Sequence, residues 1–204
     1  MGNPEPRPDR PRIFCIGLNK TGTTSFHEAM TTLGFESLHW GGPEIRDKVQ
    51  AALDAGAPLL AHLDPRYDAF SDILLLTTNF DVLDEQYPGS RFVLTVRPFD
   101  AWIDSRRRHV EHNIVRKAEG RYDGTFLVVD EDAWRLEWNT HLARVRQYFA
   151  GRDDFLEIDI TSDPGWGPFC EFLSRPEPDA PFPWTNPGRR ASSSGAQRED
   201  TPSA

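Results

Sequence analysis

The stretch of sequence that decides the fold runs from Arg12 to Met30 and reads RIFCIGLNKTGTTSFHEAM. It opens with the apolar run IFCI (13–16), which is typical of a buried parallel strand. The Gly-rich turn GLNKTGTTS (17–25) follows and leads into a predicted helix, whose apolar face is formed by Phe26, Ala29, Met30 and Leu33. Such a turn directs backbone N–H groups and the positive end of the helix dipole at one point. The sequence therefore predicts a phosphate-binding loop.

The position of the lysine distinguishes this loop from that of nucleotide hydrolases and kinases. Gly17 and Gly22 have the G-x-x-x-x-G spacing, but the hydrolase pattern places Lys directly after the second Gly. Here Thr23 stands at that position and Lys20 lies inside the loop. The ammonium is then expected beside the bridging atoms of a ligand and not over a terminal phosphate. The alternative interpretation is a Gly/Thr turn at a helix start with an exposed Lys.

Strand, G-x-x-K-T-G-T-T-S and helix, in this order, resemble the 5′-phosphosulfate loop of sulfotransferases, whose donor is 3′-phosphoadenosine 5′-phosphosulfate (PAPS). The resemblance extends over roughly residues 11–187 and implies that Lys20 acts on the bridging oxygen as electrostatic stabiliser or acid. No metal is expected, because the phosphosulfate carries less charge than a triphosphate. The loop residues that the resemblance assigns to the donor are Asn19, Lys20, Thr21, Gly22, Thr23, Thr24 and Ser25.

A second motif begins with RFVLTV (91–96), another run typical of a buried strand. Arg97 follows it, and Ser105 comes eight residues later in a predicted helix. In sulfotransferases an Arg and a Ser at this spacing hold the 3′-phosphate, and a guanidinium suits bidentate phosphate binding. The chain departs from the family's Arg-Asp-Pro start, because Pro98 and Phe99 follow Arg97.

A third segment, YDAFSDI (67–73), is similar to the Asp-Ala-x-x-Asp-x-Pro stretch of small sulfotransferases, with Leu74 in place of the Pro. The resemblance makes Asp72 the first candidate for the general base. His62 and Asp68 are rivals, and His39, at the end of a predicted strand, could also face the site. The other interpretation of Asp72 is that it caps the helix that follows.

The composition is that of one globular domain. The chain has 204 residues, of which 38% are hydrophobic, and its net charge of −9 argues against general nucleic-acid binding. The sequence shows neither an apolar run near 18 residues nor a signal-like N-terminus. A cytoplasmic location without membrane partners is therefore expected. Cys15 and Cys170 are expected to be buried thiols, and neither has the spacing of a metal ligand. The oligomeric state stays open.

One local basic patch stands out against the acidic balance. It is either a solvated helix face, or part of it stabilises the 3′-phosphate or steers an anionic donor. Its members are Arg106, Arg107, Arg108, His109, His112, Arg116, Lys117 and Arg121.

The alternation of strands and helices predicts an α/β fold of the P-loop type, in which helices cover both faces of a central parallel sheet. Residues 1–10 are interpreted as a flexible arm, 11–186 as the sulfotransferase-like domain and 187–204 as a disordered tail. The predicted strands are 13–17, 35–39, 58–62, 91–96 and 154–158. The predicted helices are 23–33, 43–55, 70–86, 98–117, 131–150 and 165–173.

These observations favour a PAPS-dependent sulfotransferase. It would move a sulfuryl group to a hydroxyl or amine of a small-molecule or carbohydrate acceptor and release adenosine 3′,5′-bisphosphate. Two alternatives stay open: a small-molecule P-loop kinase and a non-catalytic nucleotide-binding module.

Overall fold

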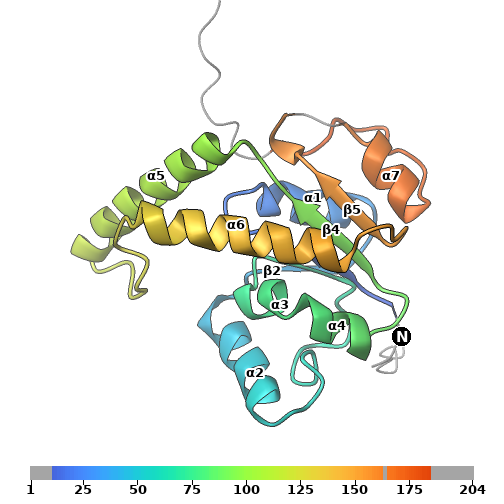
Figure 1. Cartoon of the computed structure of the whole chain (residues 1–204), viewed down its shortest axis with the longest axis horizontal. Helices are drawn as coiled ribbons and strands as arrows, with labels where there is room; N and C mark the ends of the chain where they lie inside the picture. Colours follow the sequence, from blue (N-terminus) through green and yellow to red (C-terminus); the bar gives the residue numbers. More distant parts are fainter. Residues whose placement is uncertain (1–10, 163–164, 185–204) are drawn as a thin grey trace, which may run out of the picture.

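A computed structural model describes residues 11–162 and 165–184; the predicted arm 1–10 and tail 187–204 lie outside the described residues. At its centre is a five-stranded sheet in which every pairing is parallel (Figure 1). Across the sheet the strands follow the order β2 (Ser37–His39), β3 (Ala69–Ser71), β1 (Ile13–Cys15), β4 (Arg91–Thr95) and β5 (Phe155–Ile158). The predicted α/β fold with a parallel sheet is confirmed.

Helices connect each strand to the next one along the chain, as parallel pairing requires, and the last described helix follows the last strand. Five of the predicted helices are present with ends that shift by a few residues: α1 (Thr23–Thr32), α2 (Gly42–Asp54), α5 (Phe99–Ala118), α6 (Glu131–Tyr148) and α7 (Gly167–Leu173). The other described helices are α3 (Leu74–Thr78), α4 (Phe80–Gln86) and the 3-10 helix Ile160–Ser162.

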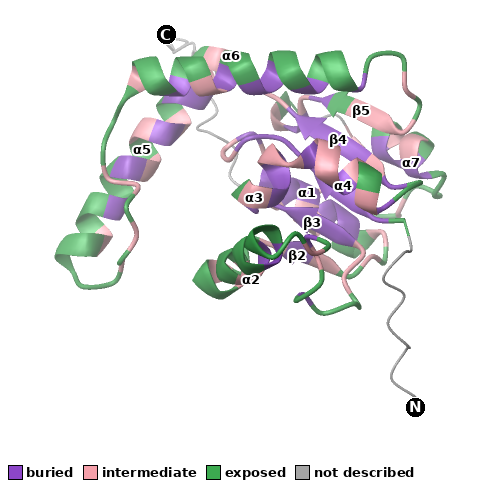
Figure 2. Cartoon of the chain, turned by 60° about the horizontal axis from the view of Figure 1, so that its bottom comes forward, coloured by how far each residue is buried: buried purple, intermediate pink, exposed green. Residues whose placement is uncertain are grey.

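The core consists of two apolar layers separated by the sheet, because side chains alternate along each strand. In β1, Ile13 and Cys15 face the layer that contains α1 and α7, with Phe26 and Phe169. Phe14, between them, faces the layer built from α2 to α6. Figure 2 shows the central strands buried and the outer faces of α2, α5 and α6 exposed. The result is the three-layer arrangement that the sequence predicts.

The third strand is not where the sequence analysis placed it. Residues 58–62 form turns, in which the N–H of Ala61 donates to the Pro58 carbonyl at 2.8 Å. The strand is β3, whose register pairs Phe70 with Leu38 of β2 and Phe14 of β1. The apolar residues of 58–62 are typical of a strand, but Leu59 alone among these five is fully buried, in the apolar layer built from α2 to α6. β3 is buried because β2 and β1 flank it on either side. The short sequence Ala-Phe-Ser is therefore sufficient to form a strand there.

The predicted helix 70–86 is also divided. Its first residues belong to β3, and the helical part is interrupted at Asn79, which separates α3 from α4. The Asn79 amide donates to the Leu75 carbonyl at 2.8 Å, and this side-chain bond competes with continuation of the helix.

Other expectations concern buried side chains. Trp134 and Trp138 of α6 pack in the core, and Tyr148 at the end of that helix is exposed. Cys15 and Cys170 are buried and not disulfide-bonded, as expected. Among the described residues no helix combines the length and the apolar character that crossing a membrane requires.

Candidate active site

The predicted functional residues meet at the carboxyl edge of the sheet. The loop from Gly17 follows β1, Asp72 follows β3 and Arg97 follows β4, and these three strands are neighbours. Ligands of open parallel sheets bind at this edge, where the strand order reverses. A cavity of about 280 Å³ opens there, lined by Lys20, Gly22, Thr23, Thr24, Ser25, Asp72, Arg97, Ser105, Ile160, Thr161 and Trp184.

The loop depends on glycine where it leaves β1. A Cβ atom at Gly17 would lie 2.0 Å from Thr95 Oγ1 and 2.5 Å from the Thr95 carbonyl oxygen, so only glycine fits beside β4. Thr21 stabilises the same turn, because its hydroxyl donates to the Leu18 carbonyl at 2.5 Å and contacts Thr95 Oγ1 at 2.7 Å. The buried Thr21 side chain therefore shapes the loop from behind and does not line the cavity.

The second glycine begins helix α1. Gly22 has φ 99°, a conformation that favours glycine, and a Cβ there would lie 2.5 Å from Ile160 Cγ1. Thr23, Thr24 and Ser25 form the first turn of α1 and line the cavity. The helix N-terminus thus presents its N–H groups and three hydroxyls at the place predicted for a phosphate.

The second motif holds the first in place. Arg97 Nη1 donates to the Lys20 carbonyl at 2.9 Å, and Trp102 Nε1 of α5 donates to the Asn19 carbonyl at 2.8 Å. Two buried atoms, Arg97 Nε and Asn19 Oδ1, have no hydrogen-bond partner in the described part of the chain. A buried guanidinium N–H without a partner is costly, and an anion beside Arg97 would satisfy it.

Lys20 carries the loop's positive charge into the cavity. Burial lowers the pKa of its ammonium, the charge of Asp72 opposes that effect, and Arg97 and Arg108 lower the pKa further. Its backbone has φ 68°, in the left-handed region. The cavity therefore concentrates positive charge that an anion would stabilise.

Asp72 lies directly after β3 with φ 59°, and its side chain is 26% exposed. Burial raises its pKa to about 6, while Lys20 and a hydrogen bond from Thr23 oppose that rise. The N-cap position of α3 belongs to Ile73 and has no side-chain cap, so the alternative that Asp72 caps this helix is wrong. A partly buried carboxylate that titrates near neutral pH suits a general base.

His39, at the end of β2, is the histidine beside Asp72. Its Nε2 lies 3.9 Å from Asp72 Oδ2 and 3.5 Å from Thr24 Oγ1, and its Nδ1 lies 2.9 Å from Ser71 Oγ. The ring stacks on that of His27, with centroids 5.4 Å apart. Burial, followed by the charge of His27, lowers the pKa of His39 to about 4, so the imidazole is neutral at pH 7.

The rivals His62 and Asp68 are not brought to this edge. Asp68 precedes β3 and accepts a hydrogen bond from the Glu36 N–H at 3.2 Å, at the amino end of the strands. His62 is exposed in the turns that precede β3, and both of its neighbours in the chain line a different cavity.

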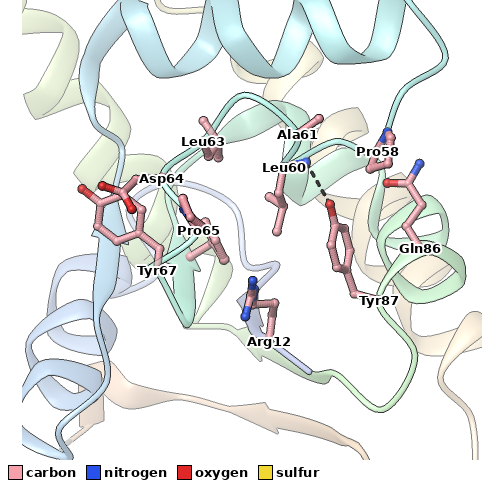
Figure 3. Close-up of a pocket in the computed structure, with 11 residues that line it drawn as sticks. Arg12, Pro58, Leu60, Ala61, Leu63, Asp64, Pro65, Tyr67, Gln86 and Tyr87 are labelled. Atoms are coloured by element: carbon pink, nitrogen blue, oxygen red, sulfur yellow. Dashed lines mark hydrogen bonds between the residues drawn. The ribbon is translucent and has the colours of Figure 1, made fainter. Parts of the chain in front are cut away.

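That second cavity, of about 490 Å³, lies where the strands begin (Figure 3). Its wall is mainly apolar, with Leu60 and Tyr87 joined by a 3.1 Å hydrogen bond from the Leu60 N–H to the Tyr87 hydroxyl, and Arg12 lies at its base. None of the predicted site residues lines it.

The basic patch divides into groups with different surroundings. Arg106 is buried and pairs with Glu137 at 2.6 Å, and Arg107 pairs with Asp104 at 2.8 Å and with Glu131. Arg108 is exposed, and its charge acts on Lys20 and on Arg97. The patch is therefore not one uniformly solvated face, and a role of part of it in donor binding stays a prediction.

Three residues that line the cavity were not predicted. Ile160 and Thr161 come from the 3-10 helix after β5, and Trp184 comes from the segment that follows α7. The sequence does hold a signal for Ile160 and Thr161, because they closely follow the predicted strand 154–158 and so lie at the carboxyl edge of the sheet. For Trp184 no comparable signal exists, because tertiary packing alone returns that segment to the site.

The comparisons with known proteins agree with this geometry. A scan against protein families matches the sulfotransferase domain over residues 12–119 and 112–191, which is most of the chain. A search of curated proteins gave no match. With both motifs inside the matched region, the chain belongs to the family of sulfotransferase domains.

Proposed function

We propose that the protein transfers a sulfuryl group from PAPS to a hydroxyl or amine of a small-molecule or carbohydrate acceptor. The observation that carries this proposal is that one cavity is lined both by Lys20 of the loop and by Arg97 and Ser105 of the second motif. These groups suit the two phosphate-bearing ends of a single nucleotide, and the family match supports the same reaction class.

The residues present fit such a donor. The first turn of α1, with Thr23, Thr24 and Ser25, would hold the 5′-phosphate through N–H groups and hydroxyls. Arg97 and Ser105 would hold the 3′-phosphate, and the buried Nε of Arg97 would gain the acceptor that it lacks within the described residues. Asn19 and Thr21 would contribute by shaping the loop.

The donor supplies an activated sulfuryl group on a phosphate oxygen. As the acceptor oxygen or nitrogen forms its bond to sulfur, the bond from sulfur to that phosphate oxygen breaks. Lys20 would stabilise the negative charge that develops on the departing oxygen. Asp72 would accept the acceptor's proton and later release it to water, which completes the balance of atoms and charge.

Turnover of labelled PAPS by the wild-type protein and by Lys20→Ala tests the proposal. We expect Lys20→Ala to lower kcat by at least about 100-fold and to weaken nucleotide binding only modestly, because its main interaction arises in the transition state. Lys48→Ala is the matched control, since Lys48 lies on α2 in an i,i+4 pair with Glu44. Near-full kcat in Lys20→Ala would refute the role of Lys20.

A further inference from the structure

Three residues other than glycine have left-handed backbone conformations at the carboxyl edge of the sheet. Lys20 has φ 68°, Trp40 has φ 54° and Asp72 has φ 59°, and they come after β1, β2 and β3 respectively. A bulky side chain avoids this region, and backbone strain of this kind gathers at functional sites. The proposed reaction uses Lys20 and Asp72 but leaves Trp40 without a role.

The turn that contains Trp40 would accept glycine more easily. Trp40, Gly41 and Gly42 have φ values of 54°, 70° and 83° in succession. At Gly41 a Cβ would lie 2.4 Å from Ile45 Cγ1, so the turn is tightly packed on one side. The indole at position 40 therefore stands where the backbone favours a residue without a side chain, and its presence calls for a function of the side chain itself.

A backbone hydrogen bond places the main chain of Trp40 beside the segment that carries the candidate base. Its N–H donates at 2.9 Å to the carbonyl of Ser71, the residue before Asp72, and His39, the residue before Trp40, lies 3.9 Å from the Asp72 carboxylate. Trp40 is 58% exposed, whereas tryptophans such as Trp102 are buried. A second exposed apolar residue, 62% exposed, follows Asp72 two positions later at Leu74.

The charges near Trp40 restrict which acceptor molecules could bind against its indole. Asp72 contributes a carboxylate, and burial keeps His39 neutral at pH 7. The positive charges belong to the predicted donor end of the site, where Arg97 and Arg108 lower the pKa of Lys20 and Arg108 also lowers that of Arg97. An anionic acceptor would be repelled by Asp72, whereas a neutral ring could cover the indole and direct a hydroxyl at the carboxylate.

We propose, on the basis of the function proposed above, that Trp40 is the platform for the acceptor and that the acceptor is a neutral molecule with its hydroxyl on a ring. The ring would stack on the indole while the hydroxyl reaches Asp72. Phenols and sugars share this chemistry, so the test uses one of each, 2-naphthol and octyl β-D-glucoside.

The test compares initial rates of the full-length protein and of Trp40→Gly, Trp40→Phe and the control Leu136→Ala, an exposed residue of α6. For the probe that the wild type accepts, we expect Trp40→Gly to raise KM about tenfold and Trp40→Phe to raise it less. The KM for PAPS and the affinity for adenosine 3′,5′-bisphosphate should not change. The urea midpoint of Trp40→Gly should be equal to or above that of wild type, because glycine relieves the strain.

The outcomes separate this inference from the function on which it rests. An unchanged acceptor KM in Trp40→Gly, or a wild type that binds the bisphosphate but accepts neither probe, would overturn the platform and its acceptor class alone. Saturation-transfer NMR of each probe with the bisphosphate complex gives a readout independent of turnover. Failure of the bisphosphate to bind would overturn the proposed function and this inference with it.

Discussion

Burial favours the neutral forms of both Lys20 and Asp72. It lowers the pKa of Lys20 and raises that of Asp72, while the attraction between the two charges opposes both shifts. A lysine with a lowered pKa is a better proton donor, and a carboxylate with a raised pKa is a better proton acceptor near pH 7. This pairing suits a reaction that needs an acid at the leaving oxygen and a base at the acceptor.

The pKa of Asp72 predicts how activity depends on pH. Since the carboxylate must be ionised to accept a proton, kcat/KM should fall as pH drops through about 6, the pKa of the ligand-free protein. Asp72→Asn should lower kcat steeply and abolish this limb of the profile. If Asp72→Asn keeps the wild-type rate while His39→Ala or His62→Ala loses it, the base is a histidine.

The same substitution has a predicted effect on stability. A folded-state pKa near 6, above the ordinary value of 3.8, means that ionised Asp72 destabilises the fold as pH rises through about 6. Asp72→Asn should therefore raise the free energy of unfolding at pH 7.5, by at most about 3 kcal/mol, and the gain should vanish below pH 4. Urea titrations at the two pH values measure the difference; a loss of stability at pH 7.5 would contradict this reasoning.

Arg97 is predicted to distinguish donors that carry a 3′-phosphate from those that do not. Arg97→Ala should raise the KM for PAPS roughly 10- to 100-fold, as the loss of a charge-assisted contact does. The KM for adenosine 5′-phosphosulfate, which lacks that phosphate, should rise less. That smaller rise would come from loss of the hydrogen bond that Arg97 donates to the Lys20 carbonyl. Equal effects on the two donors would show that Arg97 acts through the loop alone.

At the scale of elements, the buried Arg106 of α5 contacts both α6 and the segment between the two helices. The Arg106 guanidinium lies over three aromatic rings, those of Trp102, Phe126 and Trp134, at 4.7, 5.0 and 4.7 Å, and pairs with Glu137. Because Ser105 precedes it on α5, this contact also fixes the helix that lines the cavity.

Arg106→Ala should therefore destabilise the fold by about 3 kcal/mol, since it leaves Glu137 without its partner and empties the space between the rings. Arg107→Ala is the control on the same helix: its side chain is 43% exposed, so loss of its solvent-screened ion pairs should cost much less stability. Chemical denaturation of the two variants gives the comparison, and equal losses would contradict the distinction.

Elements with a strong local signal were predictable from the sequence, and those determined by neighbours were not. The strand before the Gly-rich loop, and the strand before Arg97, are continuous apolar runs followed by amphipathic helices. β3 contains a single large apolar residue, Phe70, and becomes a strand because β1 and β2 flank it. The proximity of His39 to Asp72 follows from the register that pairs His39 with Ser71, which no local pattern reveals.

At the scale of the whole molecule, the sheet order brings together residues that are far apart in the chain. Lys20 and Arg97 are 77 residues apart, yet they are hydrogen-bonded because β1 and β4 are neighbours. Strand adjacency in a parallel sheet thus converts two separate motifs into one cavity. The central claim is that this cavity binds a nucleotide with phosphates at its 3′ and 5′ positions.

The most direct test of that claim is thermal unfolding of the full chain with adenosine 3′,5′-bisphosphate, and separately with ATP and magnesium. Bisphosphate at about 100 times its dissociation constant should add about 2.7 kcal/mol of stability, a rise in Tm of about 5–10 °C, and Arg97→Ala should reduce the rise. ATP with magnesium should give a smaller shift, because the loop lacks Lys after Gly22. No rise with millimolar bisphosphate, or a larger rise with ATP and magnesium, would contradict the account.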